Sequence, residues 1–394
     1  MVRRESLNKF YKFIIFFLGF TGFYAILVIM VNSGFENQSR IITVPLRLVV
    51  IFGIILTVIS QKKLKIDKLL TLFFIFSFLY YARILFSFLT EETYNITIES
   101  FFLYYTAYVF IPIIIGSLIK YRRSDINRLY WAITIGGIIL GISSLLFYGD
   151  AIGNVKRLSA NLDSGEVSPL ILSYNSALAI GVSTTVFLIK NCSKKVKWYS
   201  ILVILINIVP FYLGASRGSV LALAFPLLFI LITGRLNVSK GKVLTIIAVC
   251  VVVFFIGSEF LGSGLLDRIF KTNEVLNYGE DVRLQMWFSS IDQLLKDPII
   301  GNSLVNNLFN MYPHNILIES ALATGIIGCL IYMSFFGFIF KRIKFLMKKD
   351  PIYMIVFVIF LQSFIKAMFS GGLYTTLLLS LSSGMIISIY KYRS

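Results

Sequence analysis

The chain alternates between long apolar runs and short polar connections from one end to the other. Each run holds roughly twenty residues, the length that an α-helix needs to cross the ~30 Å hydrocarbon core of a bilayer. Backbone polar groups find no partner in hydrocarbon, so such runs are expected to be helical. The pattern predicts an all-α polytopic membrane protein with about twelve transmembrane helices in a single transmembrane domain, residues 1–394. The predicted spans are 13–31, 41–60, 69–89, 100–119, 129–148, 169–189, 198–213, 219–234, 243–260, 315–340, 351–370 and 372–390.

The longest polar interruption is a large external loop, residues 261–314, between the ninth and tenth predicted spans. Apolar residues recur at helical spacing in its second half, and Pro298 and Gly301 follow as a stop signal. This spacing predicts an amphipathic helix with Trp287 on its apolar side, lying at the membrane surface over the bundle. The apolar residues of this predicted helix are Val282, Met286, Trp287, Ile291, Leu294 and Leu295.

Composition and charge add orientation to this picture. Hydrophobic residues make up 57% of the chain and charged residues 14%, with a mean hydropathy of +0.84 and a net charge of +18. Cytoplasmic loops retain Lys and Arg, and alternate connections hold 26 of the 37 basic residues. Both termini are therefore predicted to be cytoplasmic and the 261–314 loop periplasmic. Because the positive charge is spread over short loops, no nucleic-acid partner is expected. The basic segments are 1–12, 61–68, 120–128, 190–197, 234–242, 341–350 and 391–394.

Three basic residues interrupt the predicted spans, each in the external half of its helix: Arg47, Arg83 and Lys366. Long basic side chains reach the interface by snorkelling, which is the simpler reading of each one alone. Intramembrane charges otherwise face a bundle interior or an aqueous cavity. Taken together, these three are candidate cavity charges.

Three further arginines lie at the same external side. Arg157 and Arg283 are in external loops, and Arg217 stands in "GASRGSV", which joins two spans with almost no loop. Arg217 could be a topological anchor, although an external anchor would oppose the charge bias of the other loops. Guanidinium groups bind phosphates in bidentate fashion, so these arginines predict a pocket for an anion such as a lipid diphosphate.

The only histidine of the chain, His314, follows Pro313 where the external loop meets the tenth predicted span. A helix N-terminus disfavours the imidazolium form, and a neutral imidazole can act as a general base. A structural hydrogen-bonding role stays open. Asn315 and Glu319 are candidates to orient the imidazole or a sugar, while Glu319 could instead pair with a basic side chain. The sequence shows no metal-ligand cluster, and no cofactor is expected.

The stretch "YPHNILIESALATGIIG", residues 312–328, resembles the His-Asn-x-x-Leu/Ile-Glu…Gly signature of the O-antigen polymerase and ligase superfamily. "VRLQMWFSSIDQLLKDPIIG" is similar to the Arg…Trp…Pro…Gly segment of that superfamily, and "SRG" to its earlier arginine motif. The resemblance implies a metal-independent, inverting membrane glycosyltransferase. It further implies that Arg217 and Arg283, with Arg157 as a weaker match, hold a diphosphate and that His314 is the base.

The implied substrates are undecaprenyl-diphosphate-linked oligosaccharides, as donor and as acceptor, at the periplasmic face of a bacterial inner membrane. An O-antigen polymerase is favoured, with membrane lipid and a chain-length regulator protein as partners. The alternatives are an O-antigen ligase that transfers the glycan to lipid A core, and a lipid-linked oligosaccharide flippase. A flippase is disfavoured because transporters more commonly show repeated halves and broken helices.

The basic-residue pattern predicts the outcome of reporter fusions. An external location is expected for a reporter placed after an external segment, and a cytoplasmic one after a basic segment. Alkaline phosphatase and green fluorescent protein activities report the two sides, and a cytoplasmic signal at position 271 would contradict the predicted periplasmic loop. The external fusion points are Ser39, Asn95 and Lys271, and the cytoplasmic ones are Lys65, Arg123 and Lys348.

Overall fold

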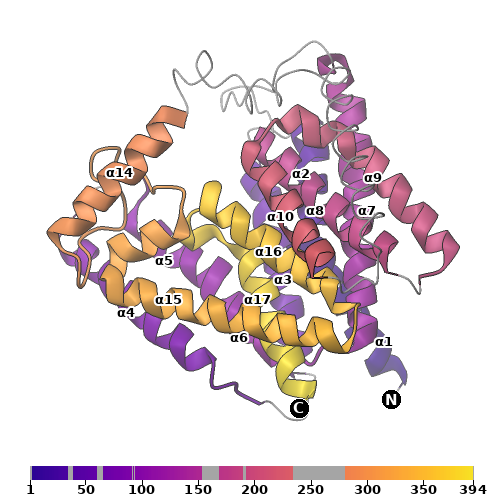
Figure 1. Ribbon diagram of the computed structural model, residues 1–394, viewed down its shortest axis with the longest axis horizontal. Helices are drawn as coiled ribbons and strands as arrows, with labels where there is room; N and C mark the ends of the chain where they lie inside the picture. The colour runs from indigo at the N-terminus through magenta and orange to yellow at the C-terminus, as the bar shows by residue number, and fades with distance from the viewer. Residues whose placement is uncertain are drawn as a thin grey trace. The chain divides into compact units, whose positions relative to one another are not determined.

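The computed structural model describes residues 2–33, 39–59, 65–90, 92, 94–152, 168–189, 192–233 and 280–393. Every regular element in these ranges is helical, apart from one isolated bridge between Asn306 and Met311 (Figure 1). The all-α prediction is therefore confirmed for the described residues. The helices are α1 (Val2–Gly19), α2 (Thr21–Asn32), α3 (Ser39–Ile59), α4 (Leu70–Leu89), α5 (Ile98–Tyr105), the π-helix η2 (Thr106–Phe110), α6 (Ile111–Leu118), α7 (Arg123–Tyr148), η3 (Gly149–Ala151), α8 (Pro169–Leu188), α9 (Lys194–Gly214), α10 (Arg217–Ile232), α14 (Glu280–Lys296), α15 (Ile316–Lys349), α16 (Tyr353–Phe369), η5 (Leu373–Thr375) and α17 (Leu377–Arg393).

Six helices of the described residues are long and apolar enough to cross a membrane, and α1 with α2 makes a seventh if the bent pair counts as one span. The shorter apolar helices α10, α16, α17 and the 48–59 part of α3 correspond to four more predicted spans. The ninth predicted span, 243–260, lies outside the described residues. A helical membrane protein is thus confirmed, and the count of twelve spans stays a prediction. The six helices are Leu70–Leu89, Ile98–Leu118, Arg123–Ala151, Pro169–Leu188, Lys194–Gly214 and Ile316–Lys349.

The chain divides into two compact units, each assembled from separate stretches of sequence. Unit 1 comprises Met1–Ser60, Arg122–Thr272 and Met347–Gln362, and unit 2 comprises Gln61–Tyr121, Asn273–Leu346 and Ser363–Ser394. Neither unit is a continuous segment, so neither could be recognised as a domain from sequence composition. The predicted single transmembrane domain over 1–394 stays a prediction.

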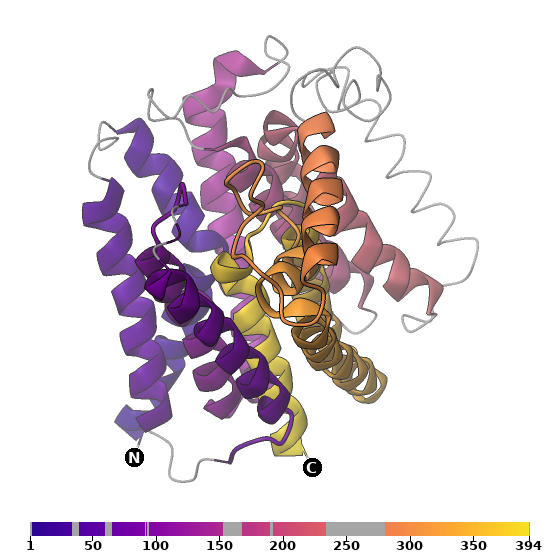
Figure 2. The ribbon, with the colours of Figure 1, turned by 90° about the vertical axis from the view of Figure 1, so that its left-hand side faces the viewer.

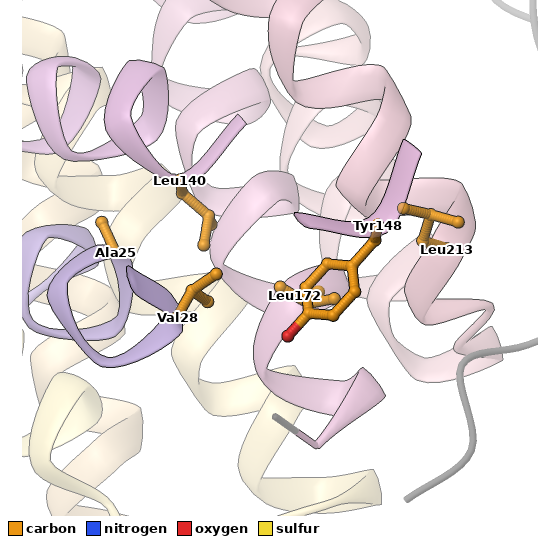
Figure 3. Packing of buried hydrophobic residues seen from close by; sticks show 6 residues of the cluster. All are labelled: Ala25, Val28, Leu140, Tyr148, Leu172 and Leu213. Atoms are coloured by element: carbon orange, nitrogen blue, oxygen red, sulfur yellow. The ribbon is translucent and has the colours of Figure 1, made fainter. Parts of the chain in front are cut away.

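Unit 1 is built around α8, which packs against α7, α9 and α10. Pro169 starts this helix at a position where its missing N–H costs no hydrogen bond. Leu172 from α8 lies among side chains from α2, α7 and α9, as Figure 3 shows. Gly214 lies so close to α8 that a Cβ there would be 2.4 Å from the Pro169 carbonyl oxygen. The small residues let the helix backbones approach closely, as is common in membrane bundles. The buried cluster is Ala25, Val28, Leu140, Tyr148, Leu172 and Leu213.

The first predicted span is not a straight helix. α1 and α2 meet at Phe20 with a bend of 59° between them. The predicted span 13–31 therefore corresponds to this bent pair of helices. In α1, before the bend, Lys12 donates a 2.8 Å hydrogen bond to the buried carboxylate of Asp125 at the start of α7. Asp125 also accepts from the Arg122 backbone N–H, which caps α7, and pairs with Arg128. This network holds the α1 and α7 ends together.

In unit 2, hydrogen bonds join segments that lie in or next to the basic connections predicted to be cytoplasmic. Arg342 near the end of α15 forms two 2.9 Å hydrogen bonds with the Asp67 carboxylate ahead of α4. Lys391 at the end of α17 donates to the carbonyls of Ser117 and Lys65, while α17 packs along α6. Four segments predicted to face the same compartment therefore meet, which supports the alternation of sides within this unit. The compartment itself stays a prediction.

The long helix α15 is interrupted at Gly325, whose backbone angles of 67° and −176° are not helical. The segment 298–303, which follows α14, packs into this interruption. The Ile326 N–H donates to the Pro298 carbonyl, and the Leu322 carbonyl accepts from the N–H groups of Asn302 and Ser303. The predicted span 315–340 therefore corresponds to a helix with a local break, where the backbone of another segment replaces the missing intrahelical bonds.

Two glycines make this backbone contact possible. Gly301 and Gly325 both have positive φ, at 71° and 67°. A Cβ on Gly325 would lie 1.9 Å from the Ile299 carbonyl oxygen, and one on Gly301 would lie 2.2 Å from the Leu322 carbonyl oxygen. Only glycine adopts these angles at little cost and leaves room for the neighbouring backbone.

Replacing Gly325 by Ala should strongly destabilise unit 2. The positive φ alone is expected to cost on the order of 1–3 kcal/mol, and the backbone clash adds to it. Gly337→Ala, on the same helix with nothing within 4 Å of an added Cβ, is the matched control and should be neutral or stabilising by up to ~1 kcal/mol. Thermal unfolding of the purified variants in detergent measures the difference, and equal melting temperatures would contradict the docked arrangement.

Candidate functional site

The predicted amphipathic helix of the external loop exists as α14, and it is fixed to the start of α15 through side-chain contacts. The Trp287 indole N–H donates a 2.7 Å hydrogen bond to the Pro313 carbonyl. Asn306 from the intervening loop donates to the Met286 carbonyl and to the Ser290 hydroxyl. These contacts hold α14 beside the start of α15, the two orange helices of Figure 2, and His314 directly follows the Pro313 that accepts the Trp287 bond.

The predicted apolar side of α14 was only partly right. Met286 is buried, whereas Ile291 and Leu295 are 45% and 67% exposed. Trp287 is half-buried because its indole is used in the hydrogen bond to the loop. The inward face consists largely of Met286, Ser290 and Gln293. Asn306 of the loop donates to the Met286 carbonyl and to the Ser290 hydroxyl, and Gln293 donates to the Val305 carbonyl. The helix therefore packs through a mixed face and exposes part of its apolar one.

His314 stands between this loop and α15 in a left-handed backbone conformation, with φ of 56°. A non-glycine residue in this region is uncommon and typically costs on the order of 1–3 kcal/mol, and such residues cluster at functional sites. The His314 ring lies against Tyr312, with centroids 4.4 Å apart. Its Nδ1 atom is buried and makes no hydrogen bond with the described residues. The strained backbone thus holds an imidazole with an uncommitted nitrogen.

The surroundings of His314 favour its neutral form. Burial lowers the His314 pKa to about 4, and the positive charge of Arg283 adds to the shift. The lowered pKa means that the imidazole is unprotonated near neutral pH and becomes charged only as the pH falls towards 4. The prediction of a neutral histidine is consistent with this direction, but its physical cause is burial with Arg283 rather than the helix N-terminus alone.

Arg283 lies in the first turn of α14 and bridges towards α16. Its guanidinium donates a 3.1 Å hydrogen bond to the Phe369 carbonyl, the last residue of α16. The side chain is only partly buried. One of the five N–H groups of an arginine is used in this bond, so others are available to an anion. The structure therefore brings Arg283 and His314, two of the predicted site residues, into one electrostatic environment.

Asn315 and Glu319 have different partners from those expected. The Asn315 side-chain oxygen accepts from the N–H groups of Leu317 and Ile318, so it caps α15. Glu319 is buried, and one carboxylate oxygen accepts from the Leu373 N–H. Its other oxygen has no hydrogen-bond partner among the described residues. The carboxylate therefore contacts neither the imidazole nor a basic side chain, and instead holds the turn between α16 and α17.

That turn contributes residues that the sequence analysis did not identify. Tyr374 in η5 is buried and lies edge-on to Tyr312, with ring centroids 5.6 Å apart. A Cβ on Gly372 would lie 3.2 Å from the Tyr312 ring. Arg283, Glu319 and Tyr312 thus all contact the 369–374 segment. The pair Gly371–Gly372 between two apolar spans was the available signal, since adjacent glycines mark a tight turn.

The remaining predicted site residues are distributed through the molecule. Arg217 is the first residue of α10 in unit 1, two residues after Ala215, whose φ of 38° makes the tight turn. Arg83 in unit 2 pairs with Glu92 at 2.8 Å and contacts the Asn302 carbonyl, which gives it a structural role. A shared anion pocket stays a prediction for these residues. Lys366 lies in the last turn of α16, while the Arg47 side chain and Arg157 lie outside the described residues.

The described residues contain no group of three or more His, Cys, Asp or Glu side chains placed to hold a metal ion. The described site brings together a neutral imidazole, a guanidinium and tyrosine side chains.

These features define a class of protein: a multi-span helical membrane protein with a half-buried, neutral histidine at the entrance of a broken helix, beside an arginine from an amphipathic loop helix. Residues 199–333 match the model of a family described as O-antigen ligase. This segment, about a third of the chain, contains all three motifs that carry the resemblance, so the similarity to the O-antigen polymerase and ligase superfamily is confirmed. No curated protein matches the chain significantly.

The single histidine allows a direct test of the site electrostatics. In protein labelled with ¹⁵N-histidine, the ring signals of His314 should stay those of a neutral imidazole from pH 8 to about 5 and titrate near pH 4. Arg283→Gln should raise the pKa towards 6.5, because a lowering charge is removed. Lys296→Gln, at the far end of α14, is the control and should leave the titration unchanged. A wild-type pKa near 6.5 would refute the buried, arginine-adjacent environment.

Proposed function

We propose that this protein is a membrane-embedded glycosyltransferase that joins undecaprenyl-diphosphate-linked repeat units, as an O-antigen polymerase. The observation that carries the proposal is the juxtaposition of a neutral imidazole, whose Nδ1 is uncommitted, with the Arg283 guanidinium. The first can take a proton from an attacking hydroxyl, and the second can receive a departing diphosphate. The match to the O-antigen ligase family over the same residues supports this chemistry.

In the proposed reaction, a hydroxyl of the acceptor sugar attacks the anomeric carbon of the donor glycan while its proton passes to the His314 imidazole. The bond between that carbon and the diphosphate oxygen breaks on the opposite face, so the configuration inverts. Arg283 stabilises the negative charge that develops on the leaving diphosphate. The family resemblance assigns the same role to Arg217 and Arg157. Tyr312 packs against the imidazole, and Tyr374 packs against Tyr312.

Arg283 couples donor binding to the strength of the base. Its charge contributes to the lowered pKa of His314, and a weak base accepts a proton poorly. A bound diphosphate would offset that positive charge and so raise the His314 pKa towards its ordinary value. The imidazole would then become a stronger base only when the donor is in place, which disfavours unproductive protonation of the empty site.

The proposed setting is the periplasmic face of a bacterial inner membrane, with a chain-length regulator protein as partner. A second candidate is an O-antigen ligase that transfers the glycan to lipid A core, because the matching family carries that description. Both functions share the donor chemistry and differ in the acceptor. The lipopolysaccharide of a deletion strain separates them, since core with a single repeat unit indicates loss of a polymerase and bare core indicates loss of a ligase.

His314→Ala should still bind the undecaprenyl-diphosphate-linked donor but lose roughly the 10² to 10⁴ in rate that general base catalysis supplies. His314→Gln retains hydrogen bonding without a titratable base, so it should not restore turnover. Arg283→Gln is the matched comparison and should weaken donor binding itself. Glycan extension by purified protein in lipid, with donor binding measured in parallel, provides the readout.

Near-normal turnover by His314→Gln would overturn the proposed base. Donor movement across the membrane without bond formation, unaffected by either histidine variant, would identify a flippase instead. Because Asn315 caps α15, the protein abundance of both variants should match that of the unmodified protein.

A further inference from the structure

Four apolar side chains form a stripe along the exposed side of α14. Leu284, Phe288, Ile291 and Leu295 are 48%, 66%, 45% and 67% exposed. Their spacing of four, three and four residues places them on one face of the helix. Isolated exposed apolar residues are ordinary, but an aligned stripe of this kind indicates an interaction surface. We refer to these four residues as the α14 stripe.

The α14 stripe lies opposite the face by which the helix is anchored. Ser290 and Gln293 are buried on that anchored face. Gln293 donates to the Val305 carbonyl and accepts from the Asn307 N–H, and the Ser290 hydroxyl meets the Asn306 side chain. Specific hydrogen bonds therefore fix the rotation of the helix about its own axis. The stripe cannot turn inwards without breaking them.

The apolar surface continues from α14 onto a spanning helix. Ile299 and Ile300, just after α14, are 63% and 74% exposed. Their segment is joined to α15 by the 2.8 Å hydrogen bond from the Ile326 N–H to the Pro298 carbonyl. From that point α15 exposes Ile326, Ile327 and Leu330, each by about half. On a helix that crosses a membrane, such a surface faces hydrocarbon, so the stripe is continuous with a lipid-facing surface.

We propose that α14 lies in the surface layer of the membrane, with the α14 stripe in contact with the hydrocarbon of the lipid bilayer. The continuity with α15 favours lipid over a second copy of the chain, because both surfaces would have to be covered together. Amphipathic helices that lie in the interface bury their apolar side roughly 5–10 Å into the boundary between headgroups and acyl chains. The hydrogen bonds made by Trp287 and by the Met286 carbonyl attach the loop that carries His314 to α14.

The position of α14 at the membrane surface also implies where the lipid-linked donor contacts the protein. This consequence rests on the proposed function. Arg283 precedes the first stripe residue by one position, so its side chain leaves the helix to one side of the stripe, near the level of the helix axis. That level is where the phosphates of membrane lipids lie. A diphosphate attached to a membrane-anchored polyprenyl chain would then reach Arg283 without leaving the bilayer surface.

Spin labelling tests the proposal on the full chain in bilayers. Cys192, Cys250 and Cys329 are first replaced by Ser, and a nitroxide is attached to single cysteines along α14. Stripe labels should collide preferentially with oxygen, which concentrates in hydrocarbon, and the exposed polar flank with a water-soluble nickel chelate. The oxygen-to-nickel collision ratio should be several-fold higher at the stripe. The stripe positions are 284, 288, 291 and 295, the flank controls are 285, 292 and 296, and position 290 reports the anchored face.

Two outcomes would overturn the proposal. Nickel accessibility at the stripe equal to that of the flank would place α14 in water. Immobile stripe labels, shielded from both reagents as at position 290, would show that protein covers the stripe. Each of the four stripe positions is labelled in a separate variant. If a label at one stripe position disturbs folding, the measurement is made at another stripe position. The measurement needs no turnover, so loss of the proposed function and failure of the membrane contact are separately observable.

Discussion

The site depends on one backbone contact, the docking of residues 298–303 into the interruption of α15 at Gly325. Carbonyl and N–H groups exposed by a broken helix must find partners away from water, and here another stretch of the same chain provides them. The contact fixes where α14 ends. Through Trp287 and the Pro313 carbonyl it also fixes the residue before His314. Removing it would release the helix and the histidine loop together.

Around that contact, polar groups hold together three segments that are distant in sequence. Arg283 binds the end of α16, Glu319 binds the turn that follows, and Tyr312 packs on Gly372. Each bond satisfies a buried backbone or charged group that would otherwise be costly. Tyr312 packs on His314, and the His314 pKa is lowered by burial and by the Arg283 charge. Arg283 and Tyr312 therefore both stabilise this part of unit 2 and set the environment of the imidazole.

At the other end of unit 2, polar groups also join segments that are distant in sequence, but there the contacts are made by charged side chains. The Asp67–Arg342 pair and the Lys391 contacts join segments through charges close to the ends of apolar helices. Long apolar runs determine where helices lie, but they contribute little to which helix meets which, because hydrocarbon solvates them equally well. Pairing is decided by small residues and by polar contacts at the helix ends, as at Gly214 in unit 1.

The sequence by itself determined the helical membrane class, the approximate bounds of the spans, the amphipathic α14 and the motifs around Arg217, Arg283 and His314. These features depend on local length, periodicity and spacing, which a linear chain displays directly. The tertiary structure alone decided the bend at Phe20, the break at Gly325, the partner of Glu319 and the part played by Tyr374. It also decided which apolar residues of α14 remain exposed. Each of these depends on a partner many residues away, and hydrogen bonds between backbones carry no signature in residue type except the glycines that permit them.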